Sequence, residues 1–174
     1  CTASGVDTPD VTSSFVDSDC DGVDGDVASM LFVAPFGDDE LGTGSPSAPF
    51  ATIGRALTVA QVSGITEIAV AEGSYPESVL AVDGVSIHGG YVAVGGWWRS
   101  ADPLAHVSVV RPVWPVLSSY SGEHETVGYE ANGITRRTIL DRLRVEAGQD
   151  LSVDPVPLFP STSNYAIRVL FSPM

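Results

Sequence analysis

Short apolar runs separated by turn residues fill residues 65–91, and this pattern organises the rest of the chain. Apolar side chains alternate at Ile68 and Val70 and again at Val85 and Ile87, the period of two that is typical of strands burying one face. Each run is too short for an ordinary helix. The pattern therefore predicts strands, arranged either as a meander of hairpins or as one coil of a parallel β-solenoid. The runs are interrupted at Gly73, Pro76, Gly84, Gly89 and Gly90.

A single helix is predicted just before this region, near residues 52–63. Thr52 is a suitable N-cap, and Gly64 follows the last apolar position. The apolar stripe at i, i+3, i+4 and i+7 consists of Ile53, Ala56, Leu57 and Ala60. We expect this helix to cap the first coil of a solenoid, because an uncapped coil would expose its core. A first strand is expected over residues 30–34.

Further apolar sets follow at intervals that suggest repeated coils. Ile87, Val109, Val145 and Val169 lie 22, 36 and 24 residues apart. Residues 138–146 fit a strand, although the spacing of their leucines also fits a helix. Residues 114–130 and 148–164 are expected to be loop excursions. Because the last coil has no polar cap, we expect the fold to be incomplete at its C-terminal end or covered there by another chain.

The net charge of −14 is concentrated near the N-terminus. Ten acidic residues and no basic one precede Arg55, and the chain contains no lysine. This balance argues against nucleic acid or an anionic membrane surface as a partner, and favours cations or a basic partner. The absence of lysine also excludes Schiff-base chemistry.

The aspartates at positions 17, 19 and 21, followed by Gly22, match the first half of a calcium loop. The position that normally carries a bidentate glutamate is Ala28, so Asp24 or Asp26 must substitute for it. A solvated acidic run is the alternative interpretation. Calcium is the predicted cofactor, with ligands Asp17, Asp19, Asp21, Val23 (through its carbonyl), Asp24 and Asp26.

A cysteine at the first position is what remains after cleavage of a bacterial lipoprotein signal, and we predict lipidation of Cys1. A disulfide between Cys1 and Cys20 is the alternative, and both interpretations imply export. Residues 1–16 are small, polar and acidic, so they are expected to form a flexible tether. The predicted organisation is a tether (1–16), a calcium-loop-like segment (17–28) and a β-helix (29–174).

The sequence FVAPFGDDELGTGSPSAPFATIGRALTVAQ, followed by TEIAVAEGSYPESV and DGVSIHGGY, resembles the opening of right-handed parallel β-helix proteins of the pectin-lyase-like superfamily. The resemblance covers residues 31–91 and implies an all-β, right-handed parallel β-helix with a short N-terminal capping helix. The Asp-rich segment behind Cys1 resembles exported bacterial surface lipoproteins that carry such domains. It implies an envelope, outer-membrane or cell-surface location.

Two functions are compatible with these features. The first is a non-catalytic, calcium-stabilised surface lipoprotein, serving as a scaffold, an adhesin or a subunit of an envelope assembly. It would be anchored to the membrane through Cys1 and would bind protein subunits or polysaccharide, but not nucleic acid. The alternative is a carbohydrate-active enzyme or glycan-binding module. A catalytic set is hard to assemble, because His88 has no assignable partner and because Arg142 and Arg144 are expected on an outward strand face opposite Asp141.

Overall fold

The computed structural model describes residues 2, 5, 7–9, 15, 17–102, 104–112, 116–117, 124–147 and 162–170. The helices are η1 (Val27–Ser29) and α1 (Ile53–Ser63). The strands are β1 (Met30–Val33), β2 (Glu67–Ala71), β3 (Gly73–Tyr75), β4 (Val79–Leu80), β5 (Ser86–Val92), β6 (Trp98–Arg99), β7 (Ser108–Val110), β8 (Val116–Leu117), β9 (His124–Asn132), β10 (Leu140–Asp141), β11 (Leu143–Val145) and β12 (Thr162–Leu170). In the part of the chain that is described, neither helix is long and apolar enough to cross a membrane.

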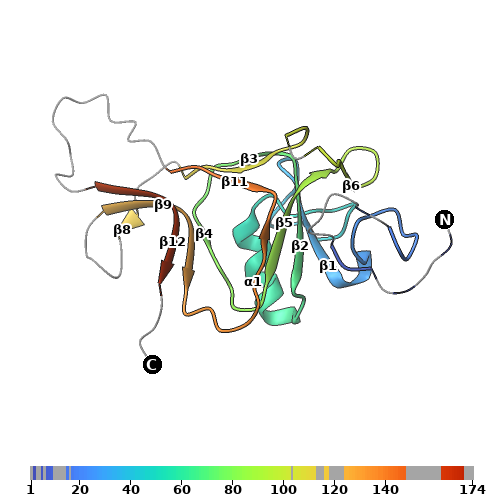
Figure 1. Ribbon diagram of the computed structural model, residues 1–174, viewed down its shortest axis with the longest axis horizontal. Helices are drawn as coiled ribbons and strands as arrows, with labels where there is room; N and C mark the ends of the chain where they lie inside the picture. The colour runs from blue at the N-terminus through green and yellow to red at the C-terminus, as the bar shows by residue number, and fades with distance from the viewer. Residues whose placement is uncertain are drawn as a thin grey trace.

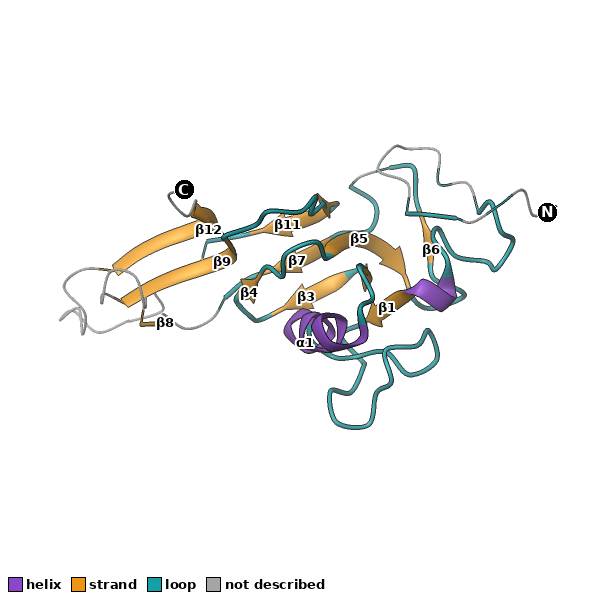
Figure 2. Cartoon of the chain, turned by 90° about the horizontal axis from the view of Figure 1, so that it is seen from below, coloured by secondary structure: helices purple, strands orange, loops and turns teal. Residues whose placement is uncertain are grey.

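The strands form three small sheets that the chain visits in turn (Figures 1 and 2). Sheet 1 has the order β1-β2-β5-β10 with β6 added to β5. Sheet 2 has the order β3-β7-β11, and sheet 3 has the order β4-β9-β12 with β8 added to β9. All pairs are parallel except β5–β6 and β8–β9.

The parallel register stacks apolar side chains in columns between the sheets. In sheet 1 the column is Leu31, Ile68, Ile87 and Leu140. In sheet 2 it is Tyr75, Val110 and Val145, and in sheet 3 it is Val79, Tyr129 and Ile167. Except for Ile167, the residues of these columns belong to the main core, because side chains paired in register point to the same face of a sheet.

The predicted helix is confirmed as α1, with the expected cap at each end. Thr52 accepts a hydrogen bond from the backbone N–H of Arg55, and Gly64 takes the left-handed conformation at φ 78°. The buried stripe consists of the four predicted residues, Ile53, Ala56, Leu57 and Ala60. The helix packs on β1, β2 and β4, and so it covers the end of the sheets where the first strands lie (Figure 2).

Sheet 1 is buried on both faces at β1 and β2. On the face opposite the main core, Phe32 and Tyr91 form a second core around Trp97. The rings of Trp97 and Phe32 pack edge to face, with their centroids 4.7 Å apart. The expected strand at residues 30–34 is confirmed by β1, but all four of its residues are buried. A two-residue alternation is lost where both faces are covered.

The predicted fold class, an all-β right-handed parallel β-helix, is wrong for this structure. The strands instead form three small sheets together with one helix, and two strand pairs are antiparallel. Strand lengths are uneven, from two residues in β4 to nine in β9. The residues between β5 and β7 add β6 to sheet 1 and fill the second core, so this part of the chain does not repeat the preceding one.

The proposed repeat is also wrong, since its four positions are distributed over three sheets: Ile87 in sheet 1, Val109 and Val145 in sheet 2, and Val169 in sheet 3. The loop expected at residues 114–130 is wrong where β8 and most of β9 occupy it. The preference for strand over helix at residues 138–146 is confirmed, but as two strands, β10 and β11. They meet at Arg142, which has a φ of 51°.

Candidate functional site

The aspartate loop, residues 17–26, is folded by its own carboxylates. Asp17 accepts hydrogen bonds from the backbone N–H groups of Asp21 and Gly22, at 3.2 and 3.1 Å. Asp21 accepts from Val23 and Val27 at 2.9 and 2.7 Å. Short carboxylate side chains that capture nearby amides hold a tight turn, and Gly22, at φ 95°, supplies the left-handed backbone that the turn needs.

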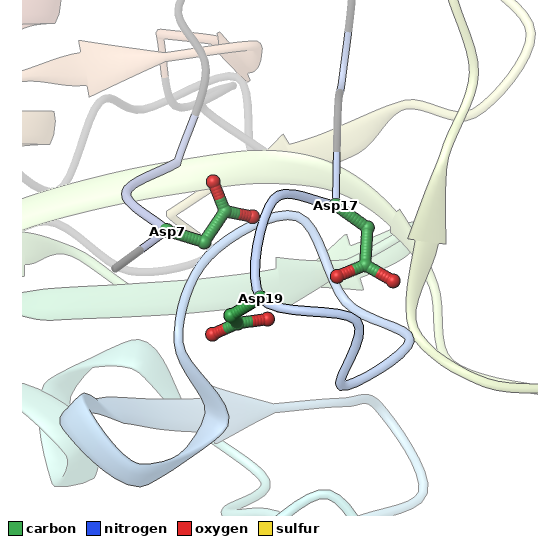
Figure 3. Close-up of side chains that lie close together, drawn as sticks. All are labelled: Asp7, Asp17 and Asp19. Atoms are coloured by element: carbon green, nitrogen blue, oxygen red, sulfur yellow. The ribbon is translucent and has the colours of Figure 1, made fainter. Parts of the chain in front are cut away.

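Five aspartates converge at this loop in two groups. Ligand oxygens of Asp7, Asp17 and Asp19 lie within 4.8 Å of one another (Figure 3), and so do those of Asp19, Asp21 and Asp26. Asp19 belongs to both groups. The loop therefore offers adjoining sets of oxygen ligands, the type that calcium prefers.

Asp7 was missed by the sequence reasoning, which placed it in the tether. It is 6% exposed and accepts a hydrogen bond from the backbone N–H of Gly25 at 3.0 Å. Phe15, also in the expected tether, lies 4.6 Å from the guanidinium of Arg99. These two residues are therefore held against the body of the protein. An aspartate ten residues before the D-S-D-C-D-G run offered little signal for such a contact.

The predicted ligands separate into two sets. Asp17, Asp19, Asp21 and Asp26 belong to the two groups. Asp24 instead faces the protein interior, where its Oδ2 accepts a hydrogen bond from Arg99 Nη1 at 2.9 Å. Val23 donates its N–H to Asp21 and buries its side chain in the second core, and the role of its carbonyl stays a prediction.

The electrostatics of the loop favour a cation. The pKa of Asp19 is raised by partial desolvation and by the carboxylates of Asp21, Asp17 and Asp7, although a backbone N–H of Asp21 opposes the shift. Because like charges this close destabilise one another, a divalent ion among them would relieve the repulsion. The donor set fits calcium, since every side-chain ligand is a hard carboxylate oxygen.

Behind the loop lies the buried charge cluster, which consists of Asp24, Arg99, Asp141, His88 and Glu67. Arg99 on β6 bridges Asp24 and Asp141. His88 on β5 contacts Glu67 on β2 through Nε2 at 2.7 Å, and its Nδ1 lies 3.8 Å from Asp141 Oδ2. The cluster thus links the aspartate loop to four strands of sheet 1 (β2, β5, β6 and β10), in an alternation of acidic and basic groups.

Burial and pairing shift the pKa values within the cluster in opposite senses. Burial lowers the pKa of His88, but its contacts with Asp141 and Glu67 outweigh burial and raise it. For Asp141, burial raises the pKa, whereas His88 and Arg99 together lower it below its usual value. Both shifts favour the charged forms, as expected when each group faces an opposite charge.

The cluster is suited to holding structure rather than to turning over a substrate. His88 is 1% exposed and Arg99 is 7% exposed, so the two basic groups of the cluster are buried away from solvent. The sequence alone assigns no partner to His88, and the structure supplies two, Glu67 and Asp141, which lie 21 and 53 positions away in the sequence. Arg142 and Arg144 do not share a face, since the corner at Arg142 separates them. Arg142 binds the carbonyl of Ser100 and Arg144 binds Glu146.

The cysteines bear on the predicted lipid anchor. Cys20 is disulfide-bonded. The sequence holds one other cysteine, Cys1, which lies outside the described residues. A thioether-linked lipid on Cys1 and an intrachain disulfide at Cys20 exclude each other chemically. The disulfide is the alternative that the sequence left open.

Comparison of the chain with protein-family models, with curated proteins and with solved structures found no match. The resemblance inferred from residues 31–91 therefore gains no support from known proteins. Function must be argued from the aspartate loop and the buried charge cluster.

Proposed function

We propose that this chain is a non-catalytic scaffold domain of an exported surface protein, stabilised by calcium in its aspartate loop. The observation that carries the proposal is the convergence of Asp7, Asp17, Asp19, Asp21 and Asp26 in two groups of oxygen ligands. In the sequence no basic residue precedes Arg55, so the N-terminal segment supplies no positive charge of its own to these aspartates. Calcium would supply it and would fix the loop on sheet 1.

A scaffold role is supported by where the polar chemistry lies. The buried charge cluster is nearly sealed, with its most exposed side chain, Glu67, at 28%. Its charged side chains pair with one another, and the pair of Asp24 with Arg99 holds the loop to the strands. The disulfide at Cys20 supports an oxidising compartment, since such bonds are rare in the reducing cytosol.

Calcium-dependent stability tests the proposal. The purified chain is stripped with EDTA and its thermal unfolding is followed with and without calcium. We expect calcium at 100 times its dissociation constant to stabilise the fold by about 2.7 kcal/mol. An Asp19→Asn variant, which changes the aspartate shared by both groups, should lose most of the response.

Asp102→Asn is the matched control, because it removes the same charge from an exposed loop acid whose described contact is with the N–H of Leu104. It should keep the full calcium response. Identical melting temperatures in EDTA and in calcium would refute the proposed site. Cleavage of pectate or alginate by the wild-type chain would favour the carbohydrate-active alternative.

Anchoring is a separate part of the proposal, and the intact mass decides it. An unlipidated chain two hydrogens lighter than its reduced form would establish the disulfide and exclude a lipid on Cys1. A mass increased by a diacylglycerol would establish the membrane anchor.

A further inference from the structure

The three sheets end on the same side of the molecule, in β10, β11 and β12. Each is the last strand of its sheet in the described part of the chain and pairs there with one parallel neighbour. Figure 2 places β11 and β12 on the side away from α1. We call this side the open end.

Along each core column, the exposed fraction of the side chains rises at the open end. In sheet 3, Val79 is 2% exposed and Tyr129 is 6% exposed, but Ile167, next in register, is 51% exposed. Val169, in register with the partly buried Ala131, is 52% exposed. In sheet 2, Val145 is half-buried, although Tyr75 and Val110 before it are each only 1% exposed. Core-facing apolar side chains thus reach solvent there, beside strand edges that can accept another strand.

The opposite end is closed. Helix α1 covers β1, β2 and β4. The outer edge of β1 is also occupied, because the backbone N–H of Phe32 donates to the carbonyl of Gly44 and the carbonyl of Phe32 accepts from the N–H of Phe50. A partner that stacks on the open end of one molecule would therefore find no equivalent surface at the closed end. Two open ends can face each other, and that contact stops at two molecules.

The charge distribution permits this contact. Residues 124–147 and 162–170, which include β10, β11 and β12, carry four acidic residues and five arginines, whereas the whole chain has a net charge of −14. In Figure 1 the aspartate loop and sheet 3 lie at opposite ends of the long axis. Two open ends can therefore approach with little electrostatic repulsion.

We propose that two copies of this chain associate through their open ends about a two-fold axis, so that Ile167 and Val169 of each copy are covered by the other. The contact buries the ends of the core columns and pairs exposed strand edges. The inference does not depend on calcium binding by the aspartate loop.

The test is the molar mass in solution, measured by light scattering after size-exclusion chromatography over a range of protein concentrations. We expect twice the 18.1 kDa of one chain. An Ile167→Asp, Val169→Asp double variant should shift to the single-chain mass. Val62→Asp is the matched control, because Val62 on α1 is 82% exposed at the closed end, and this variant should remain dimeric.

Hydrogen exchange in the wild-type chain tests the contact independently of the double variant, which could lose the dimer by misfolding. In the wild-type chain, backbone amides of β12 should exchange more slowly as concentration rises, whereas amides of α1 should not respond. A wild-type chain of single mass at every concentration, with β12 exchange independent of concentration, would overturn the proposal. So would larger assemblies that Val62→Asp dissociates, because they would require the closed end.

Discussion

The aspartate loop and the buried charge cluster are neighbouring regions, and in each of them several carboxylates lie close together. In the loop, Asp17, Asp19, Asp21 and Asp26 bind backbone N–H groups and stay partly or fully exposed, whereas Asp7, which joins them from outside the loop, is buried. In the cluster, acidic and basic side chains alternate from Asp24 to Glu67, and most are buried. Each acidic group there has a cationic partner from another strand.

The difference shows that the source of the counter-charge decides how deep a carboxylate can lie. A buried charge is tolerated only when it is paired, so Arg99 and His88 allow Asp24 and Asp141 to leave water. The aspartates of the loop lie in a stretch of sequence without basic residues. We propose that calcium supplies the positive counter-charge there. Asp24 lies within the aspartate loop in sequence, but its side chain belongs to the buried charge cluster.

The largest effect is expected from removing the basic residue at the centre of the cluster. Arg99→Leu leaves Asp24 and Asp141 without the guanidinium that bridges them. Breaking a buried ion pair by deleting one partner costs about 3–5 kcal/mol, and we expect a loss of that size in the free energy of unfolding measured in urea.

Arg144→Leu is the control, because Arg144 pairs with Glu146 on the surface and its side chain is 67% exposed. Exposed pairs contribute roughly 0–1 kcal/mol. Equal losses in the two variants would show that the cluster is no more important to stability than a surface pair.

A second pair of variants should separate the two regions directly. Asp24→Asn keeps the shape of the side chain but loses a charged hydrogen bond to Arg99, which should cost about 1.5–3 kcal/mol with or without calcium. Asp21→Asn should instead abolish much of the calcium-dependent rise in melting temperature. If Asp24→Asn removed the calcium response and Asp21→Asn did not, Asp24 would be a calcium ligand, as its sequence position alone suggests.

Local signals in the sequence were reliable where neighbours decide the structure. The capped helix α1 was predicted at nearly its observed bounds, because Thr52 and Gly64 act on residues within one turn of themselves. The strand at residues 138–146 was less evident, because the spacing of Leu140 and Leu143 also fits a helix and the preference for strand rested on the supposed repetition of coils. By contrast, β9 was taken for a loop, since glycine and polar residues such as Thr126 and Gly128 mask a strand whose burial comes from its neighbours.

The site was harder to predict because it is assembled over long separations. Arg99 joins Asp24 and Asp141, which lie 75 and 42 residues from it in the sequence. Local signals in a sequence, such as apolar periodicity and short motifs, do not show which distant residues will form a pair. The aspartate loop was visible because four of its five converging carboxylates lie within ten consecutive residues, but Asp7 and the inward turn of Asp24 required the fold.

The smallest effect, and the most diagnostic for the cluster, concerns His88 and pH. Its neighbours are Glu67 on β2, Asp141 on β10 and Arg99 on β6, and the two carboxylates raise its pKa against the effect of burial. A raised folded-state pKa contributes stability that is complete below the unfolded-state pKa of about 6.5 and is lost as pH rises through the folded value.

His88→Gln keeps a polar side chain but cannot titrate in this range. The wild-type advantage in free energy of unfolding over this variant should therefore be greatest near pH 6 and shrink as pH rises from about 6.5 through the folded-state pKa, by about 1.4 kcal/mol for each unit by which that pKa is raised. Urea unfolding of both proteins from pH 6 to pH 9 measures it. An advantage that grew with pH would mean that His88 is held neutral, and the cluster would then have to be stabilised by Arg99 alone.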